Sequence, residues 1–299
     1  MQLNGVEIRD SFAEAFPMRC TRLVLTAADA RWARTAATTM TGFATSVIAC
    51  GCEAAIEREL APEETPDGRP GMAVMIFAMS DKDLTKQLRN RVGQCVLTCP
   101  SAAAYAGMDA PPRLPLGRAL RFFGDGFQSS KRLGERRYWR VPVMEGEFLV
   151  EDMVGTAKGI GGGNFLILAA TAEAARRAAE AAVAAIAPLP GSILPFPGGV
   201  ARSGSKIGSR YKGLIASTND AYCPTLRSRT ASTALPADCG SVLELVIDGV
   251  DEAAIAAATA AGVRAACAPG RAGGVLAIDA GNYGGKLGPH HFHLRRLLA

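Results

Sequence analysis

The sequence predicts an α+β protein built from duplicated ferredoxin-like halves, each made of split βαβ units, that pack as two lobes. The chain has 299 residues, of which 48% are hydrophobic and 20% are charged, a composition typical of globular proteins with a full core. A strand–helix–strand pattern occurs four times along it. Two such patterns in a row form one ferredoxin-like half, so four indicate an internal duplication.

Each predicted helix lies between two short runs rich in Val, Leu and Ile. Thr171 and Asp251 stand at N-cap positions, and Glu173 and Glu252 fall in the first turns, where a negative charge is favourable. Gly262 is the expected C-cap of the last helix. The predicted strand–helix–strand ranges are 23–26, 28–40 and 44–49; 73–77, 81–92 and 94–98; 165–168, 171–187 and 192–194; and 242–247, 251–261 and 275–278.

Comparison of the two halves locates an insertion. The first strands are 142 residues apart (Val24 to Leu166), whereas the third strands are 170 apart (Val74 to Glu244). The second half therefore holds about 28 extra residues, within a polar, Gly-rich stretch at about 196–240, where binding groups are expected to collect. We predict an N-terminal lobe at 1–148, ending in a hairpin tail from about residue 105, and a C-terminal lobe at 149–299.

Charge and cysteine usage exclude several classes of protein. A net charge of +5, scattered along the chain, lacks the dense basic patterning of a nucleic-acid binder, although it would favour acidic substrates. The eight cysteines form no C-x-x-C pair, which together with the absence of a signal peptide indicates a reduced, cytoplasmic protein. No run of 18 apolar residues predicts a membrane span.

Glu244 is the most informative single residue. Alternation along residues 242–247 places Leu243, Leu245 and Ile247 toward the covering helix, and Glu244 on the opposite face. A carboxylate there would be partly desolvated, its pKa would rise, and it would suit proton transfer near neutral pH. Two other interpretations remain open at this point: the strand face is solvent-exposed, or Glu244 is paired with an arginine.

Two Gly-rich segments and a histidine cluster are weaker candidates for binding sites. Residues 161–163 precede a strand and lack the Gly-Lys-Ser/Thr of a P-loop, so nucleotide binding is not favoured. Residues 281–288 form either tight turns or backbone amides open to a ligand, with Lys286 either an anion contact or a surface charge. His291 and His293 would share a strand face near His290, with no carboxylate or cysteine nearby in sequence, so we expect no metal site.

Several unusual motifs, spread in one order from near the N-terminus to the C-terminus, resemble those of the formylmethanofuran:tetrahydromethanopterin formyltransferases. Because they are long and specific, the resemblance covers nearly the whole chain. They are EAF at 14–16, TGFATSVI at 41–48, PEETPDGRPG at 62–71, FFGDG at 122–126, GEF at 146–148, PFPGG at 195–199, STNDAYCP at 217–224 and GGKLG at 284–288.

The resemblance implies transfer of a formyl group between the amine of a methanofuran-type carrier and N5 of a tetrahydromethanopterin-type pterin. It implies two ferredoxin-like lobes, dimers or tetramers, and no metal or tightly bound cofactor. The basic, Ala- and Arg-rich composition resembles bacterial members, for which the resemblance implies oxidation of formaldehyde to formate and, in some, a formyltransferase/hydrolase complex. The chain departs from the family pattern around residues 109–118 and 227–236.

The resemblance also implies roles for residues. The family's acid/base glutamate falls on the strand that matches Glu244. Asn219 and Tyr222 are candidates for stabilising an oxyanion or for contacting the pterin, and Asp220 either orients them or caps a turn. The other expected substrate-binding residues are Lys206, Asn282 and Lys286. A second hypothesis is a non-catalytic pterin-binding or assembly subunit on the same scaffold.

Overall fold

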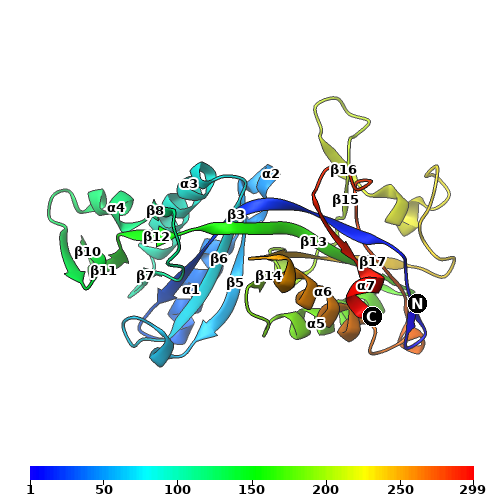
Figure 1. Ribbon diagram of the computed structural model, residues 1–299, viewed down its shortest axis with the longest axis horizontal. Coiled ribbons are helices and arrows are strands. Elements are labelled where there is room, and N and C mark those ends of the chain that lie inside the picture. The colour runs from blue at the N-terminus through cyan, green and yellow to red at the C-terminus, as the bar shows by residue number, and fades with distance from the viewer. The chain divides into compact units, whose positions relative to one another are not determined.

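The computed structural model describes residues 1–299 and shows a mixed α/β protein with two compact units (Figure 1). Unit 1 comprises Met1–Pro17 and Ile160–Ala299, and unit 2 comprises Met18–Gly159. The predicted division at residue 148 therefore misplaces the N-terminal segment. That segment belongs to unit 1 because β2 (Val6–Ile8) pairs with β18 (Val275–Asp279), and the start of β3 (Phe12–Thr26) pairs with β19 (His290–His293).

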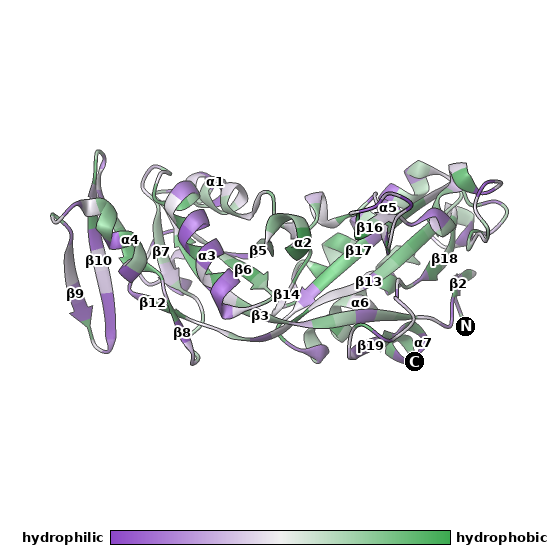
Figure 2. Ribbon diagram, turned by 90° about the horizontal axis from the view of Figure 1, so that it is seen from above, coloured by the Kyte–Doolittle hydropathy of each residue, from purple (hydrophilic) through white to green (hydrophobic).

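Unit 2 contains a sheet in which β5, β6, β3 and β7 are neighbours in that order, all antiparallel. Beyond β7 the sheet continues through β11, β10 and β9, the predicted hairpin tail, where β9 is exposed along its whole length and polar (Figure 2). The elements after β3 are α1 (Ala30–Thr41), β4 (Thr45–Ser46), α2 (Val47–Cys50), β5 (Cys52–Leu60), β6 (Gly71–Ala78), α3 (Asp81–Arg91), β7 (Ala103–Ala106), β8 (Arg113–Pro115), α4 (Gly117–Leu120), β9 (Ser129–Leu133), β10 (Arg136–Val143), β11 (Gly146–Glu151) and β12 (Met153–Gly155).

Two predicted strands of unit 2 are wrong. In the stretch 44–49 only Thr45–Ser46 is strand (β4), and residues 47–49 belong to α2, which begins where the Ser46 hydroxyl accepts a hydrogen bond from the Ile48 amide. The long strand follows at β5. The stretch 94–98 overlaps a π-helical turn, and the fourth strand is β7. The turn buries Val92 and Val96, which are four residues apart and so share one helical face. Short apolar runs do not distinguish a strand from a buried helical turn.

Unit 1 has a sheet in which β18, β13, β17 and β14 are neighbours in that order, the same order as in unit 2. Its central strands are hydrophobic over most of their length (Figure 2). The elements are β1 (Gln2–Leu3), β2, β13 (Ala157–Ala169), α5 (Ala172–Ile186), β14 (Ser192–Ile193), β15 (Ser205–Ile207), β16 (Ala216–Thr218), β17 (Ser241–Gly249), α6 (Glu252–Ala266), β18, β19 and α7 (Leu294–Leu298).

The predicted N-caps are confirmed, but the predicted C-cap is not. Thr171 and Asp251 accept hydrogen bonds from the third residue of α5 and α6. Gly262 lies inside α6, where an added Cβ would be 2.7 Å from Ile186 Cδ1 and 3.0 Å from Phe165 Cζ. The glycine thus lets α6 approach α5 and the sheet closely. None of the helices is both long and apolar enough to cross a bilayer.

The helix N-caps of the two units give a residue-by-residue correspondence between them. Their first N-caps, Asp29 and Thr171, are 142 residues apart, and their second N-caps, Ser80 and Asp251, are 171 apart. The residue that corresponds to Glu244 is therefore Ala73 rather than Val74. The difference matters because a shift of one residue moves a side chain to the other face of a strand.

In each unit the two long helices cover one face of the sheet. In unit 1, Leu245 and Ile247 of β17 belong to the core formed with α5 and α6, as predicted. On the opposite face, Leu166 and Leu168 of β13 pack with residues of the polar insertion, among them Leu235 and Cys239. The insertion thus covers the helix-free face, and its β15–β16 hairpin projects away from the sheet (Figure 1).

Candidate active site

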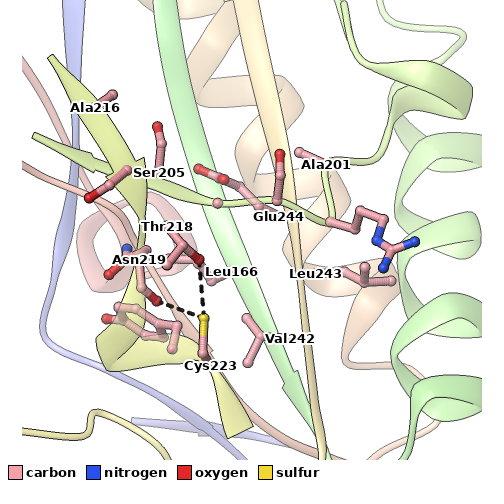
Figure 3. A pocket seen from close by; sticks show the side chains of 15 residues that line it. Leu166, Ala201, Ser205, Ala216, Thr218, Asn219, Cys223, Val242, Leu243 and Glu244 are labelled. Atoms are coloured by element: carbon pink, nitrogen blue, oxygen red, sulfur yellow. Dashed lines mark hydrogen bonds between the residues drawn. The ribbon is translucent and has the colours of Figure 1, made fainter. Parts of the chain in front are cut away.

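A cavity of about 570 Å³ lies where the insertion covers the helix-free face of the unit 1 sheet. Such a volume lies within the usual range of small-molecule sites. Its floor is apolar, and its walls carry hydroxyl and amide groups (Figure 3). The lining residues are Leu166, Ala201, Arg202, Ser203, Gly204, Ser205, Ala216, Ser217, Thr218, Asn219, Tyr222, Cys223, Val242, Leu243 and Glu244.

Glu244 contributes the only carboxylate of this lining. Its backbone is fixed by a reciprocal bridge to Ala201, with N–O distances of 2.8 and 2.9 Å. The side chain is half-buried, and no arginine, lysine or other group of the chain binds its carboxylate. Burial alone raises its pKa to about 7, because desolvation disfavours the charged form. The predicted rise in pKa is confirmed, and the alternative of an arginine partner is wrong.

Asn219 faces the same cavity with a free side-chain amide. Its backbone is held in the insertion, since its N–H donates to the Gly204 carbonyl at 3.0 Å and its own carbonyl accepts from the Tyr222 amide at 3.0 Å. Its carbonyl also accepts from Cys223 Sγ at 3.3 Å (Figure 3). A Cβ added at Gly204 would lie 3.8 Å from Glu244 Oε2 and 3.9 Å from Asn219 Cβ. Gly204 therefore lies between the Glu244 carboxylate and Asn219.

Tyr222 lines the cavity with its hydroxyl already engaged. The hydroxyl donates to Asp279 Oδ2 at 2.8 Å, and Arg9 Nη1 donates to the same oxygen at 2.6 Å. Burial first, and the Asp279 carboxylate next, raise the pKa of Tyr222 well above its usual value. Because the single hydroxyl proton is donated to Asp279, it is not available to an oxyanion. The ring is what remains for contact with a bound molecule.

Lys206 and Asp220 lie beside the cavity but bind each other. The lysine, on β15, forms an ion pair with the Asp220 carboxylate, which also accepts a hydrogen bond from Thr230 Oγ1 at 3.0 Å. Lys206 first and Thr230 second lower the pKa of Asp220. Neither residue lines the cavity. Their observed interactions connect the hairpin to the rest of the insertion.

The Gly-rich loop at 281–288 encloses a buried carboxylate of the chain itself. Glu14 accepts hydrogen bonds at 2.5–2.8 Å from the amides of Tyr283, Gly285, Leu287 and Gly288. Burial would raise the pKa of Glu14, but these four donors lower it to about 2. The amides are therefore not open to a ligand, and the turn interpretation is confirmed by positive φ angles of 84° and 69° at Gly284 and Gly285.

The remaining candidates lie outside the cavity. Asn282 Nδ2 donates to the Phe12 carbonyl at 3.3 Å, and Lys286 is exposed on the same loop. His291 and His293 share a face, as predicted, and their rings lie 4.8 and 5.0 Å from that of Phe12. No three histidine, cysteine or carboxylate side chains come together in a group that could hold a metal ion.

Residues 161–163 lie inside β13 rather than in a phosphate-binding loop. The ladder to β17 shifts register between Ile160 and Gly163, and Gly162 has a φ of 89°. The Gly162 amide donates to Asp248 Oδ1 at 3.1 Å. The glycines therefore form a bulge in a central strand.

Comparison with known proteins identifies the family. A family model described as formylmethanofuran-tetrahydromethanopterin formyltransferase matches residues 1–143, and a model of its proximal lobe matches residues 146–297. The chain belongs to the formylmethanofuran–tetrahydromethanopterin formyltransferase family. The predicted resemblance is confirmed.

Relatives cover the chain end to end. It is 60% identical over 299 residues to the formylmethanofuran–tetrahydromethanopterin formyltransferase of Methylococcus capsulatus, with 100% of both chains covered. It is 54% identical to one subunit of the formyltransferase/hydrolase complex of Methylorubrum extorquens, covering 99% of this chain and 97% of that one. A crystal structure of the formyltransferase/hydrolase complex from Methylorubrum extorquens with methylofuran superposes with a TM-score of 0.97 at 53% identity, covering 100% and 99%.

Within this formyltransferase-family chain, three of the seven predicted residues meet in one cavity: Glu244, Asn219 and Tyr222. The serines of the cavity wall lie in the predicted insertion, but no sequence pattern singles them out. Arg9 and Asp279, which hold Tyr222, have no sequence signal either. These two are 270 positions apart. No local pattern connects them, and only strand pairing between β2 and β18 brings them together.

Proposed function

We propose that this chain is a formyltransferase that moves a formyl group between a tetrahydromethanopterin-type pterin and the amine of a methanofuran-type carrier. The observation that carries the proposal is an unpaired carboxylate with a pKa of about 7, Glu244, in the cavity of a chain that belongs to this family. In bacterial one-carbon oxidation the formyl group would pass from N5 of the pterin to the furan carrier.

The chemistry needs one group that both accepts and returns a proton. The amine nitrogen attacks the formyl carbon, a new C–N bond forms, and the carbonyl electrons move to oxygen. Glu244 accepts the proton of the attacking amine, then delivers it to the departing nitrogen as the oxyanion re-forms the carbonyl and the original C–N bond breaks. A carboxyl with a pKa near 7 is suited to both steps, because neither the charged nor the neutral form dominates near neutral pH.

The oxyanion needs hydrogen-bond donors that are not already engaged. We assign this role first to the Asn219 side-chain amide, which no other group of the chain binds. Tyr222 is assigned to contact a carrier ring, since its hydroxyl is bound to Asp279. Lys206, Asp220, Asn282 and Lys286 remain substrate-binding proposals: the first two would act through the hairpin, and the last two through the separate loop at 281–288.

Three further proposals complete this function. Both units are ferredoxin-like, supported by their shared strand order, 4-1-3-2 in chain order of the four core strands. Both carriers act as substrates, with no tightly bound cofactor. The chain forms homo-oligomers, dimers or tetramers, and joins hydrolase subunits, supported by its 54% identity to a subunit of a formyltransferase/hydrolase complex. Copurification of tagged chain from its own host tests the last.

The activity is tested by comparing the wild type with Glu244→Gln in formyl transfer between the two carriers. We expect kcat to fall by about 10²–10⁴-fold, the usual contribution of a general acid–base. In the direction where deprotonated Glu244 acts as the base, the wild-type rate should rise with pH through an apparent pKa near 7. The variant should lack this rise.

The matched control is Glu147→Gln, a change at an exposed strand glutamate on β11 that forms an ion pair with Arg140. It should transfer as fast as the wild type. If Glu244→Gln retained full activity, Glu244 would have no part in the mechanism. If the wild type bound the pterin but transferred nothing, even with hydrolase subunits present, the chain would be the non-catalytic binding subunit instead.

A further inference from the structure

Asp279, the last residue of β18, is a junction of buried hydrogen bonds beside the cavity. Its Oδ2 accepts from Arg9 Nη1 at 2.6 Å and from the Tyr222 hydroxyl at 2.8 Å. Its Oδ1 accepts from the Ala280 amide at 2.9 Å. Only 6% of the Asp279 side chain is exposed, so water does not replace these donors. Charge-assisted bonds of this kind are shorter and stronger than neutral ones.

Arg9 extends the junction into the insertion. While Nη1 binds Asp279, Nη2 donates to the Ala234 carbonyl at 2.7 Å. The Ala234 amide in turn donates to the carbonyl of Ala221, the neighbour of Tyr222, at 3.0 Å. One guanidinium thus fixes both the backbone beside Tyr222 and the carboxylate that binds its hydroxyl. A lysine has no planar fork and would satisfy only one of these acceptors at a time.

The arrangement joins three parts of unit 1 that are distant in sequence: the N-terminal segment, the insertion and the end of β18. The insertion has little regular structure of its own, with short 3₁₀ turns around Tyr222. Besides the backbone bridge between Ala201 and Glu244, the insertion is therefore attached to the sheet by such side-chain contacts and by the small apolar cluster of Leu235 and Cys239.

We propose that Arg9 and Asp279 are positioning residues that hold the Tyr222 ring as a fixed wall of the cavity and so set the affinity for the carrier bound there. The inference rests on the proposed function, since it concerns the same cavity. Neither residue touches the reacting atoms; both act through Tyr222. Fixing a binding wall in advance removes the cost of ordering it when the ligand binds.

The test compares Asp279→Asn, Arg9→Lys and Tyr222→Phe with the wild type. For each, calorimetry gives the Kd of tetrahydromethanopterin and of methanofuran, and the transfer assay gives KM and kcat. For Asp279→Asn we expect Kd and KM for at least one carrier to rise about tenfold, the size of one lost charge-assisted hydrogen bond, with kcat changed by less than about threefold. Arg9→Lys should fall between it and the wild type.

Comparing the single variants at Tyr222 and Asp279 with their double variant distinguishes positioning through Tyr222 from a general loss of stability. Tyr222→Phe keeps the ring and loses only the hydroxyl that binds Asp279, so it should raise Kd less than Asp279→Asn does. The double variant should bind no more weakly than Asp279→Asn alone, because both changes act on the same hydrogen bond between Tyr222 and residue 279. Tyr222→Phe also keeps the test intact if Asp279→Asn does not fold, since a rise in its Kd supports the proposal and an unchanged Kd contradicts it.

Asp238→Asn is the matched control, because it breaks another arginine–aspartate pair of unit 1. Asp238 of the insertion pairs with Arg271, and both side chains are exposed and outside the cavity. Its Kd and KM should equal those of the wild type. An unchanged Kd for both carriers in folded Asp279→Asn would overturn the positioning proposal. A wild type that binds but does not transfer would overturn the proposed function alone, because Kd still reports positioning.

Discussion

Units 1 and 2 have the same central sheet but different chemistry at one corresponding pair of strands. In unit 1, Leu166 of β13 lies between Glu244 and Asp279. In unit 2, Val24 of β3 lies between Ala73 and Tyr105. The strand that carries the proposed acid–base residue in one unit therefore carries a methyl group at the corresponding place in the other.

The surroundings of these two positions differ as much as the residues do. Ala73 is 2% exposed, and Met75 and Phe77 on the same face of β6 are fully buried, so no cavity opens beside Ala73. In unit 1 the same face is covered by the insertion, which encloses a cavity rather than filling it. The scaffold is shared, and we attribute the function to the insertion and to the few residues that face it.

A similar polar network occurs in both units and has different consequences. In unit 2, the Tyr105 hydroxyl donates to Asp67 Oδ2 at 2.9 Å, and Arg69 and Thr26 bind the same carboxylate. Tyr105 is 2% exposed, so its ring is part of the core. In unit 1 the tyrosine of the Tyr222–Asp279–Arg9 network lines a cavity. The same interactions thus stabilise a core in one unit and a binding wall in the other.

The largest expected effect on the free energy of unfolding comes from placing a carboxylate at the position of unit 2 that corresponds to Glu244. Ala73→Glu would bury a charge without a partner or a cavity, and we expect it to lower the free energy of unfolding at pH 8 by about 3–5 kcal/mol. Ala73→Gln, of similar volume but uncharged, is the control for overpacking. Urea denaturation measures both, and the gap between them should close below pH ~4.5, where the carboxyl is neutral. Equal stabilities at pH 8 would mean that the face around Ala73 is not dry.

The reverse change in unit 1 should be stabilising. Glu244 has a pKa of about 7 in the folded protein against 4.5 as its ordinary value, so the folded state holds the proton more tightly. Wild-type stability therefore falls as pH rises from about 4.5 to 7, whereas that of Glu244→Gln does not. By pH 8 the variant should have gained up to about 3 kcal/mol on the wild type. Thermal or urea unfolding between pH 4.5 and 8 measures the gain.

Glu14, in the same unit, provides a control because its pKa is shifted in the opposite direction to that of Glu244. Its pKa of about 2 means that the charged form is stabilised in the folded state by four backbone donors. That stabilisation is complete above pH 4.5 and is lost as pH falls toward 2. Glu14→Gln should therefore be less stable than the wild type at neutral pH, with the difference shrinking in acid. A stability gain in Glu14→Gln at pH 8 would contradict the lowered pKa of Glu14, and no gain in Glu244→Gln would contradict the raised pKa of Glu244.

Sequence patterns predicted the parts of this comparison that depend on periodicity and local chemistry. Alternation placed Glu244 on the helix-free face, and the caps Thr171 and Asp251 marked two helices correctly. The offset between units was missed by one residue, because β6, the third strand of unit 2, is buried on both faces and shows no alternation that fixes its register. That single residue decides whether Ala73 or Val74 corresponds to Glu244.

What the sequence could not predict depends on contacts distant along the chain. Glu14 attracted notice only as part of a family motif, and the four amides that bind its carboxylate come from residues about 270 positions later. The loop at 281–288, for which the sequence left both tight turns and ligand-binding amides open, binds a carboxylate that the chain supplies itself. Composition and local spacing cannot distinguish these two cases, because the loop has the same glycines in both.

The smallest expected effect on the free energy of unfolding comes from removing one helix N-cap in each unit, which tests whether corresponding caps stabilise the two units equally. Thr171 Oγ1 accepts from the Ala174 amide at 3.1 Å in unit 1, and Ser80 Oγ accepts from the Asp83 amide at 3.1 Å in unit 2. Thr171→Ala and Ser80→Ala should each lower the free energy of unfolding by about 1 kcal/mol, the usual cost of losing an N-cap. Thr171→Ser, which keeps the hydroxyl, should lose much less. Formyl transfer should not change in any of the three, because the caps lie outside the cavity. A loss of activity in Thr171→Ala without a matching loss of stability would mean that α5 does more than support the sheet, and the attribution of function to the insertion would then be incomplete.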